Sequence, residues 1–334
     1  MTPPKRAYDH PIELVAPDLS AYRHGSTGVD YVHRFDSGRP GPQVMVQALT
    51  HGNEICGAIA LDWLMLQDVR PQRGMLTLAF ANVEAFSRWD PHEPDASRFV
   101  DEDYNRIWAD ETLRGPRDSV ELRRARELVS FVDEADYLLD IHSMHEPCRP
   151  IMVCGAADRG GEKAAVLAQE LGVPEYLLID TGHPSGLRMI ERGAFGDPAH
   201  PRTAVLIECG QHWEKSAADV AIDTMLRFLW RTGVLTQDWV ESRLPLAPPP
   251  EQRLVRVTEP VVAQSLQFRF VRDFKGLEVI PKRGDPIAYD GDRAIVAPYD
   301  ETVLVMPSMA HLRVGTTMVR FGRFEPLAPK GAAQ

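Results

Sequence analysis

The stretch from Val44 to Glu54, VMVQALTHGNE, decides the fold of this chain. Its apolar first half is typical of a buried strand, and a helical pattern begins near Cys56 directly after it. His51 and Glu54 lie three residues apart on the turn between the predicted strand and helix, so an imidazole and a carboxylate can face one metal ion. The stretch therefore predicts an α/β unit with a metal-binding turn.

Composition and charge limit the classes of function. The chain has 334 residues, 44% hydrophobic and 25% charged, as expected for a folded protein of about two domains. A net charge of −11 without a basic block argues against nucleic acid or an anionic membrane as partner. The four cysteines are scattered and predict neither a disulfide scaffold nor a thiolate zinc cluster. Without a signal-peptide core or a long apolar stretch, we expect a soluble, cytoplasmic protein.

Apolar runs and amphipathic stretches alternate over the first 230 residues. This order predicts an α/β fold, and the near-continuous apolar strands predict a sheet that is buried on both faces. The strand-like runs cover residues 43–49, 75–80, 136–141, 151–154, 176–179 and 203–208. The helix-like stretches cover residues 57–69, 119–133, 161–172 and 217–231.

A proline cluster divides the chain. Residues 244–252 contain LPLAPPP, which continues neither a helix nor a central strand and is typical of a linker. Short β-like runs separated by Gly-Asp turns follow it. We therefore expect a first domain over residues 1–243 and a smaller all-β domain over residues 253–326.

Two further strand ends carry groups suited to metal chemistry. The run before Asp140 delivers His142 to its carboxyl end, and the strand 203–208 ends in Glu208. Ligands bind beyond the carboxyl ends of the strands in open α/β sheets, so these side chains can meet His51 and Glu54. Two imidazoles and one carboxylate leave the fourth position of a tetrahedral zinc ion open, which is typical of a catalytic site. Glu208 is then suited to the role of general base.

Taken in order, these motifs resemble the succinylglutamate desuccinylase/aspartoacylase family, a branch of the zinc carboxypeptidase-like hydrolases. The resemblance rests on His51-x-x-Glu54, the segment from Arg98 to Arg106, and the strand ends at His142 and Glu208. It covers roughly residues 40–230, and the trailing β region is also similar. The interval of 88 positions between Glu54 and His142 resembles the deacylase branch. The resemblance implies a mixed, largely parallel sheet flanked by helices, with a smaller all-β C-terminal domain.

The resemblance also implies a role for each matching residue. One zinc ion per chain would be bound by His51, Glu54 and His142. Glu208 would act as general base and later protonate the leaving amine, and Arg98 would stabilise the oxyanion. Asn105 and Arg106 would bind a carboxylate of a small-molecule N-acyl substrate, and the reaction would be hydrolysis of an N-acyl amino acid or a related N-acyl amine.

Several alternatives stay open at this level. His145 competes with His142 as a ligand, and Asp140 either ends its strand or orients His142 from behind. Cys56 and Cys209 are interpreted as packing residues. The Gly-rich segment 182–193 departs from the family pattern, so the roles of His183, Arg188 and Arg192 are undetermined, as are the acyl group and the amine.

Two other functions share these ligands. A zinc carboxypeptidase would cleave peptides in an open groove, whereas a non-catalytic relative would bind a small acid and lack a ligand or the base. The short interval between Glu54 and His142 and the additional β domain argue against a carboxypeptidase. The presence of all three candidate ligands and of the candidate base argues against a non-catalytic relative. The oligomeric state is left open, with a homo-oligomer as one option.

Overall fold

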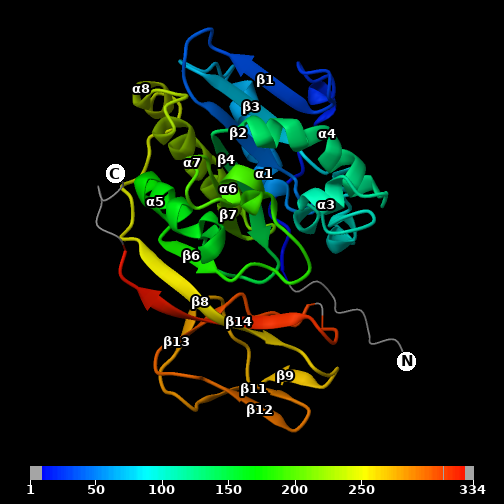
Figure 1. Cartoon of the computed structure of the whole chain (residues 1–334), viewed down its shortest axis with the longest axis vertical. Coiled ribbons are helices and arrows are strands. Elements are labelled where there is room, and N and C mark those ends of the chain that lie inside the picture. Colours follow the sequence, from blue (N-terminus) through cyan, green and yellow to red (C-terminus); the bar gives the residue numbers. More distant parts are fainter. Residues whose placement is uncertain (1–9, 311, 328–334) are drawn as a thin grey trace.

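A mixed sheet runs through the part of the chain that the computed structural model describes, residues 10–310 and 312–327 (Figure 1). Within these residues it has 11 strands in the order β1-β3-β2-β4-β7-β5-β6-β8-β14-β13-β10. Their bounds are β1 Val32–Asp36, β2 Gln43–Ala48, β3 Met75–Phe80, β4 Tyr137–Met144, β5 Ile151–Ala156, β6 Tyr176–Asp180, β7 Thr203–Gln211, β8 Arg253–Val262, β10 Glu278–Ile280, β13 Thr302–Val305 and β14 Thr317–Glu325.

Most strands of the first two thirds of the chain are parallel. Strand β2 is parallel to β3 and β4, β4 is parallel to β7, and β5 is parallel to β6. Strands β1, β5 and β6 run in the opposite direction to the other four, because β1 is antiparallel to β3, β5 is antiparallel to β7, and β6 is parallel to β5. The expected mixed, largely parallel sheet is therefore confirmed.

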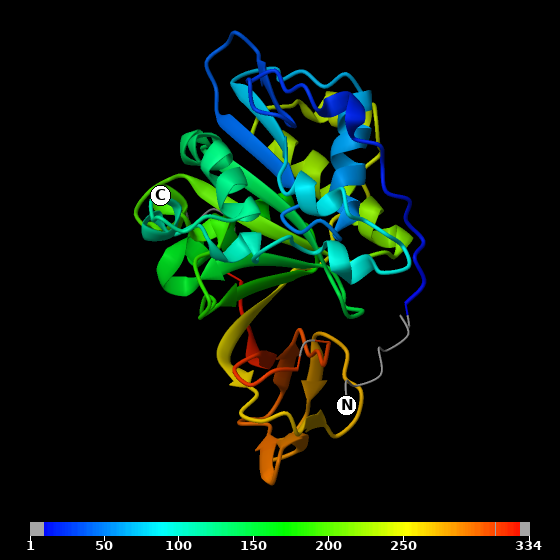
Figure 2. The same cartoon turned by 90° about the vertical axis from the view of Figure 1, so that its right-hand side faces the viewer.

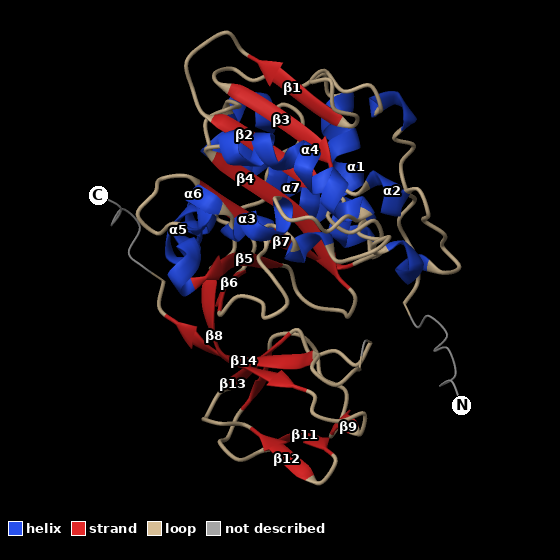
Figure 3. Cartoon of the chain, turned by 45° about the vertical axis from the view of Figure 1, so that its right-hand side comes forward, coloured by secondary structure: helices blue, strands red, loops and turns tan. Residues whose placement is uncertain are grey.

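Helices cover both faces of this sheet (Figure 3). Alternate residues of β2 show why: Val44, Val46 and Ala48 pack in one core with α1, α5 and α7, whereas Met45 packs in a second core with α4. No helix among the described residues is long and apolar enough to cross a membrane. The helices are α1 Ile55–Leu66, α2 Val83–Phe86, α3 Asp110–Leu113, α4 Val120–Glu134, α5 Glu162–Leu171, α6 Gly193–Gly196, α7 Lys215–Arg231 and α8 Gln237–Glu241.

The predicted elements lie close to the observed ones. The run 75–80 coincides with β3, and the stretch 119–133 matches α4 with a shift of one residue, because Ser119 is its N-cap and accepts a hydrogen bond from the backbone N–H of Leu122 at 3.0 Å. Strand β1 was not predicted. Its sequence VHRFD lacks a continuous apolar run, and its pairing with β3 at the sheet edge makes it a strand.

The C-terminal β region, β8 to β14, lies beside the α/β part and continues its sheet (Figures 1 and 2). Strand β8 pairs with β6 through its first residues and with β14 along most of its length. A second, three-stranded sheet in the order β12-β11-β9 completes this region, with β9 Phe268–Phe270, β11 Pro286–Asp290 and β12 Arg293–Val296. Residues 244–252 form neither helix nor strand. We keep the predicted domain boundary there as a proposal, since the sheet itself is continuous from β6 to β8.

Candidate metal centre

The turn between β2 and α1 presents His51 and Glu54. Gly52 lets this turn approach the later segment around Arg98 closely: its N–H donates to the carbonyl of Arg98 at 3.1 Å, and a Cβ at this position would lie 2.4 Å from the carbonyl oxygen of Ser97. Glu54 is the N-cap residue of α1, but its side chain makes no capping hydrogen bond. The Glu54 carboxylate is therefore directed toward His51 rather than toward the helix.

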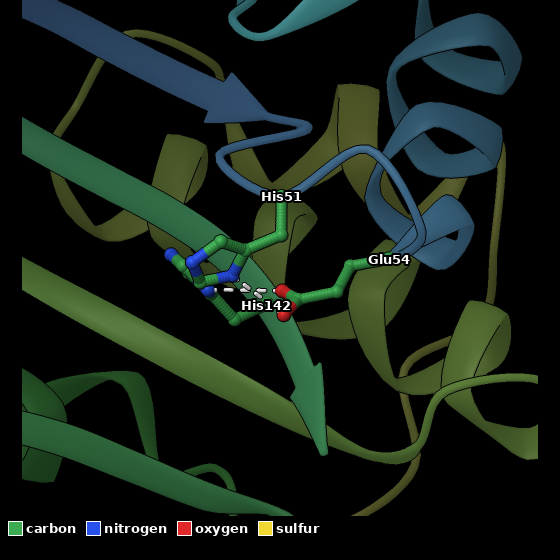
Figure 4. A group of neighbouring side chains, drawn as sticks. All are labelled: His51, Glu54 and His142. Atoms are coloured by element: carbon green, nitrogen blue, oxygen red, sulfur yellow. Dashed lines mark hydrogen bonds and ion pairs between the residues drawn. The ribbon is translucent and has the colours of Figure 1, made fainter. Parts of the chain in front are cut away.

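Three side chains converge at this point: His51, Glu54 and His142 of β4 (Figure 4). His51 Nδ1 lies 2.7 Å from Glu54 Oε1, and His142 Nδ1 lies 2.9 Å from Glu54 Oε2. One potential ligand atom from each of the three residues lies within 4.8 Å of the others, and all three residues are buried. This group could hold a metal ion, as the predicted ligand set requires.

Two carboxylates orient the imidazoles from behind. Asp140 Oδ2 lies 2.7 Å from His142 Nε2, and Asp103 Oδ1 lies 3.0 Å from His51 Nε2. In both rings Nε2 is thus occupied, and Nδ1 is the nitrogen available to a metal. Of the two roles that the sequence left open for Asp140, the structure shows the second, in which Asp140 orients His142. The sequence did not distinguish Asp103 from the other acidic residues of the stretch 101–103.

The charges at the centre are strongly coupled. Burial alone would raise the pKa of Glu54, but the imidazoles of His51 and His142 lower it well below its usual range. Burial alone would likewise lower the pKa of His142, but Asp140 and Glu54 raise it well above that of a free imidazole. The buried carboxylates and imidazoles therefore stabilise each other's charged forms. The donor set of two imidazole nitrogens and one carboxylate fits a divalent cation.

Glu208 lies next to this centre on the adjacent strand β7, in direct register with His142. Its Oε2 is buried and has no hydrogen-bond partner within the described part of the chain. Burial raises the pKa of Glu208 to about 8; His142 opposes this rise and Glu54 adds to it. A buried carboxyl oxygen without a partner is costly, which is typical of a group kept for a reaction.

Arg98 completes what we call the metal wall: His51, Glu54, Arg98, His142 and Glu208. Its Nη2 lies 3.1 Å from His51 Nε2 and 3.4 Å from Asp103 Oδ2, and its Nη1 lies 3.5 Å from Glu54 Oε1. The guanidinium is thus held at the rim of the centre. This position fits the predicted role of Arg98 toward a developing oxyanion.

The metal wall faces a cavity of about 230 Å³. Four further lining residues, which we call the arginine wall, are Arg106, His183, Arg188 and Arg320. Residues 306–308 of the C-terminal β region also line this cavity. The all-β part of the chain therefore contributes to the cavity.

Asn105 and Arg106, the predicted carboxylate-binding pair, both line the cavity. The Asn105 side-chain oxygen accepts a hydrogen bond from the backbone N–H of Met189 at 3.2 Å. This oxygen therefore anchors the segment that contains Met189. Arg106 donates from Nη1 to the carbonyl of Asn105 at 2.7 Å. Burial lowers the pKa of Arg106 to about 10, a value at which the side chain is still positively charged near neutral pH.

The sequence left the roles of three residues in the Gly-rich segment undetermined, and their surroundings differ. Arg188 is buried and forms a bidentate pair with Asp180, with both distances at 2.7 Å, and a second ion pair with Glu191 at 2.6 Å. Arg192 pairs instead with acidic residues near the surface, Asp110 and Asp133. His183 lines the cavity.

Other candidates lie outside the centre. His145 is 3.3 Å from both Asp95 and Glu146, and it is absent from the cluster of possible metal ligands. Cys56 and Cys209 are buried in the core that contains α1 and α7, as their interpretation as packing residues requires.

Comparisons with known proteins agree with this arrangement. A family model described as the succinylglutamate desuccinylase/aspartoacylase catalytic domain matches residues 40–228, more than half of the chain. A "probable aspartoacylase" from Parasynechococcus marenigrum is 32% identical over 142 residues, 40% of this chain and 45% of that protein. The chain thus matches less than half the length of this relative.

Solved structures show the same fold at low sequence identity. A succinylglutamate desuccinylase from Vibrio cholerae has a TM-score of 0.62 and 16% identity, covering 88% of this chain and 86% of that chain. A succinylglutamate desuccinylase/aspartoacylase from Rhodobacter sphaeroides has a TM-score of 0.62 and 18% identity, covering 86% and 87%.

Proposed function

The chain belongs to the succinylglutamate desuccinylase/aspartoacylase family, and we propose that it is a zinc-dependent amidohydrolase that cleaves a small N-acyl amino acid or a related N-acyl amine. The observation that carries this proposal is the position of Glu208. Its unpartnered buried oxygen lies in one cavity with the cluster of His51, Glu54 and His142. A metal-binding protein without a reaction has no need for such a costly group.

One zinc ion per chain is proposed at the cluster. When bound, it supplies Lewis acidity toward the scissile carbonyl and toward a water molecule. His51, His142 and the Glu54 carboxylate would hold it, and Asp103 and Asp140 orient the two imidazole rings.

Glu208 moves the proton. In the proposed reaction its carboxylate accepts a proton from the attacking water and then gives it to the nitrogen of the leaving amine. The raised pKa of Glu208 suits both steps. A carboxylate with an ordinary pKa is a weak base, and only a small fraction of it is protonated at neutral pH and able to return a proton to the amine. Arg98 stabilises the negative charge that develops on the carbonyl oxygen.

Other residues that line the cavity bind the substrate. Arg106 presents a planar guanidinium suited to a carboxylate, with the Asn105 amide beside it. The volume of about 230 Å³ is below the ~300–1,000 Å³ of common ligand pockets, which favours a small acyl amide over a peptide.

The test compares the full-length protein with its Glu208→Gln variant. Elemental analysis is expected to find one zinc per chain in both, and amine release is measured with N-acetyl and N-succinyl amino acids, N-acetyl diamines and dipeptides. We expect an N-acyl compound to be the best substrate and kcat to fall about 10²–10⁴-fold in the variant. Glu84→Gln, on the exposed face of α2, is the matched control and retains activity.

Two results would contradict the proposal. Unchanged activity of Glu208→Gln on every cleaved substrate would exclude the general-base mechanism, and faster cleavage of dipeptides would favour a carboxypeptidase. The cytoplasmic location, the small-molecule partner and a homo-oligomeric state stay predictions.

A further inference from the structure

The segment from Arg98 to Asp103 carries two groups of the metal centre, but none of its residues belongs to a helix or a strand. Asp103 is held by its own side chain, which lies 3.0 Å from His51 Nε2 and accepts a hydrogen bond from the backbone N–H of Asn105 at 2.9 Å. The Arg98 side chain is 29% exposed, and its contacts are longer, at 3.1–3.5 Å. The position of Arg98 therefore depends on how its backbone is fixed.

Glu121, in the first turn of α4, fixes this backbone. Its Oε1 accepts a hydrogen bond from the backbone N–H of Val100 at 2.7 Å, and its Oε2 accepts from the N–H groups of Asp101 and Glu102 at 3.0 and 3.2 Å. The Asn82 side chain donates a fourth hydrogen bond, to Oε1, at 3.0 Å. One carboxylate thus binds three successive amides, and successive N–H groups in a turn are a common anion-binding arrangement.

The charge of Glu121 is compensated by hydrogen bonds rather than by a cation. The residue is fully buried and forms no ion pair within residues 10–310 and 312–327. The N-terminus of α4 adds a favourable partial positive charge, because Glu121 lies in its first turn. A buried carboxylate is costly unless its oxygens are satisfied, and a satisfied buried network makes the groups around it rigid. This carboxylate therefore restricts residues 100–102 to one geometry.

The segment is also held from both sides. Toward α4, Asp101 Oδ2 accepts a hydrogen bond from the backbone N–H of Val120 at 2.8 Å. Toward the metal centre, the carbonyl of Arg98 accepts a hydrogen bond at 3.1 Å from the N–H of Gly52, in the turn that presents two of the candidate ligands. Glu121 thus belongs to a continuous series of contacts between α4 and the metal-binding turn.

We propose that Glu121 is a positioning residue, which acts through the amides of residues 100–102 to hold Arg98 where the oxyanion of the proposed reaction develops. Glu121 is not among the described residues that line the cavity, so its effect on the reaction is indirect. An arginine stabilises a developing charge best when it is already in place, because no stabilisation is then lost in moving it. This inference rests on the proposed function, since it concerns the role of Arg98 in the same reaction.

Glu121→Gln in the full-length, zinc-loaded protein tests the residue. The amide keeps the size of the side chain, but its NH₂ group faces N–H donors, so at least one backbone hydrogen bond is lost. We expect kcat for the best N-acyl substrate to fall about 10–100-fold, with KM changed less than about threefold and one zinc per chain retained. Glu127→Gln, at an exposed carboxylate of the same helix, is the matched control and keeps kcat.

A double-mutant cycle separates positioning from a general structural role. If Glu121 acts through Arg98, Glu121→Gln should lower kcat less than about threefold in a protein that already carries Arg98→Met. An equal fall in kcat with and without Arg98 would overturn the inference, because Glu121 would then influence the reaction by another route. An unchanged kcat in the single Glu121→Gln variant would overturn it as well.

Glu121→Asp provides a second variant if the Gln variant does not fold. Aspartate keeps the charge and both oxygens but is one methylene shorter, so we expect a smaller fall in kcat, of about three- to tenfold. The cycle with Arg98→Met is then measured with this variant. A wild-type kcat in folded Glu121→Asp, or equal falls in both backgrounds, would contradict the proposal.

Hydrogen exchange separates this inference from the proposed function. We expect the amides of residues 100–102 to be protected in the zinc-loaded protein and to exchange at least about tenfold faster in Glu121→Gln, whereas the amides of α7 are unchanged. If no substrate releases an amine but exchange increases in this segment alone, the proposed reaction fails and the positioning of the segment stands. If amines are released and exchange increases everywhere or nowhere, the inference alone fails.

Discussion

The metal wall and the arginine wall line one cavity, but their charges are compensated in different ways. The metal wall comes from the end of β2, the segment around Arg98, and two adjacent strands, β4 and β7. Its imidazoles are held on both sides by carboxylates at 2.7–3.0 Å. The arginine wall combines a turn, a loop and a strand of the C-terminal β region, and among the described residues Arg320 has no hydrogen-bond or ion-pair partner. The two groups therefore differ in charge compensation: the metal wall is held by its own carboxylate contacts, whereas the arginine wall retains a positive charge that a ligand can meet.

If the two walls have these separate roles, substitutions in the metal wall should alter metal content and kcat. Substitutions in the arginine wall should instead alter the stability of the fold, KM and the preference among substrates. The following predictions test this division, from the largest expected effect to the smallest.

Glu54→Gln should abolish the metal centre. The amide offers one neutral oxygen in place of a buried carboxylate that contacts both His51 and His142, so the stoichiometric zinc and at least about 10³-fold of the activity should be lost. Elemental analysis and amine release measure both. Retention of zinc with full activity would show that Glu54 is not a ligand.

Arg188→Met should mainly destabilise the fold. The change leaves Asp180 and Glu191 buried without their partner, which costs about 3–5 kcal/mol in the free energy of unfolding. Denaturant unfolding of metal-loaded protein measures the loss. Arg192→Met is the matched control, because its partners are about half exposed and the expected loss is only about 1 kcal/mol. Equal losses in both variants would contradict the structural role of Arg188.

Arg98→Met should lower kcat by about 10²–10³-fold while zinc is retained, because the guanidinium touches the ligands but is not one of them. Steady-state kinetics with the best N-acyl substrate measure the effect. An increase in KM alone would instead place Arg98 among the substrate-binding residues.

Asp140→Asn should weaken zinc binding by about 10–100-fold, since the amide no longer orients His142 as a carboxylate does. Competition with a chelator of known affinity measures this. Asp68→Asn, at an exposed carboxylate, serves as the control. An unchanged affinity would mean that packing alone holds the ring.

The pH dependence of kcat/KM should reflect Glu208. A base is active when deprotonated, so the rate should fall as the pH drops through its pKa, at most tenfold per pH unit. Burial raises this pKa from 4.5 to about 8, and a bound divalent cation lowers it again, so the acidic limb should lie between these values. Arg98→Met should shift the limb to higher pH, because Arg98 lowers the pKa of Glu208. A limb at an ordinary carboxyl value would argue against Glu208.

Much of this site could be predicted because its residues follow apolar runs. The run 75–80 and the strand before His142 are recognisable without tertiary context, and parallel strands end at one edge of a sheet. His51, Glu54 and His142 could therefore be expected to meet. Asp103 could not be chosen from the acids 101–103, since only the fold shows which carboxylate reaches His51.

The sequence by itself determined the α/β order, the three candidate ligands and the candidate general base, because these depend on short-range spacing and on strand ends. Only the tertiary structure decided which arginine is neutralised and which is available. Arg188 and Arg320 are the same residue type near the same cavity, but Asp180 and Glu191 surround only the first. Charge compensation depends on neighbours brought together by folding, and such contacts leave no local signal in the sequence.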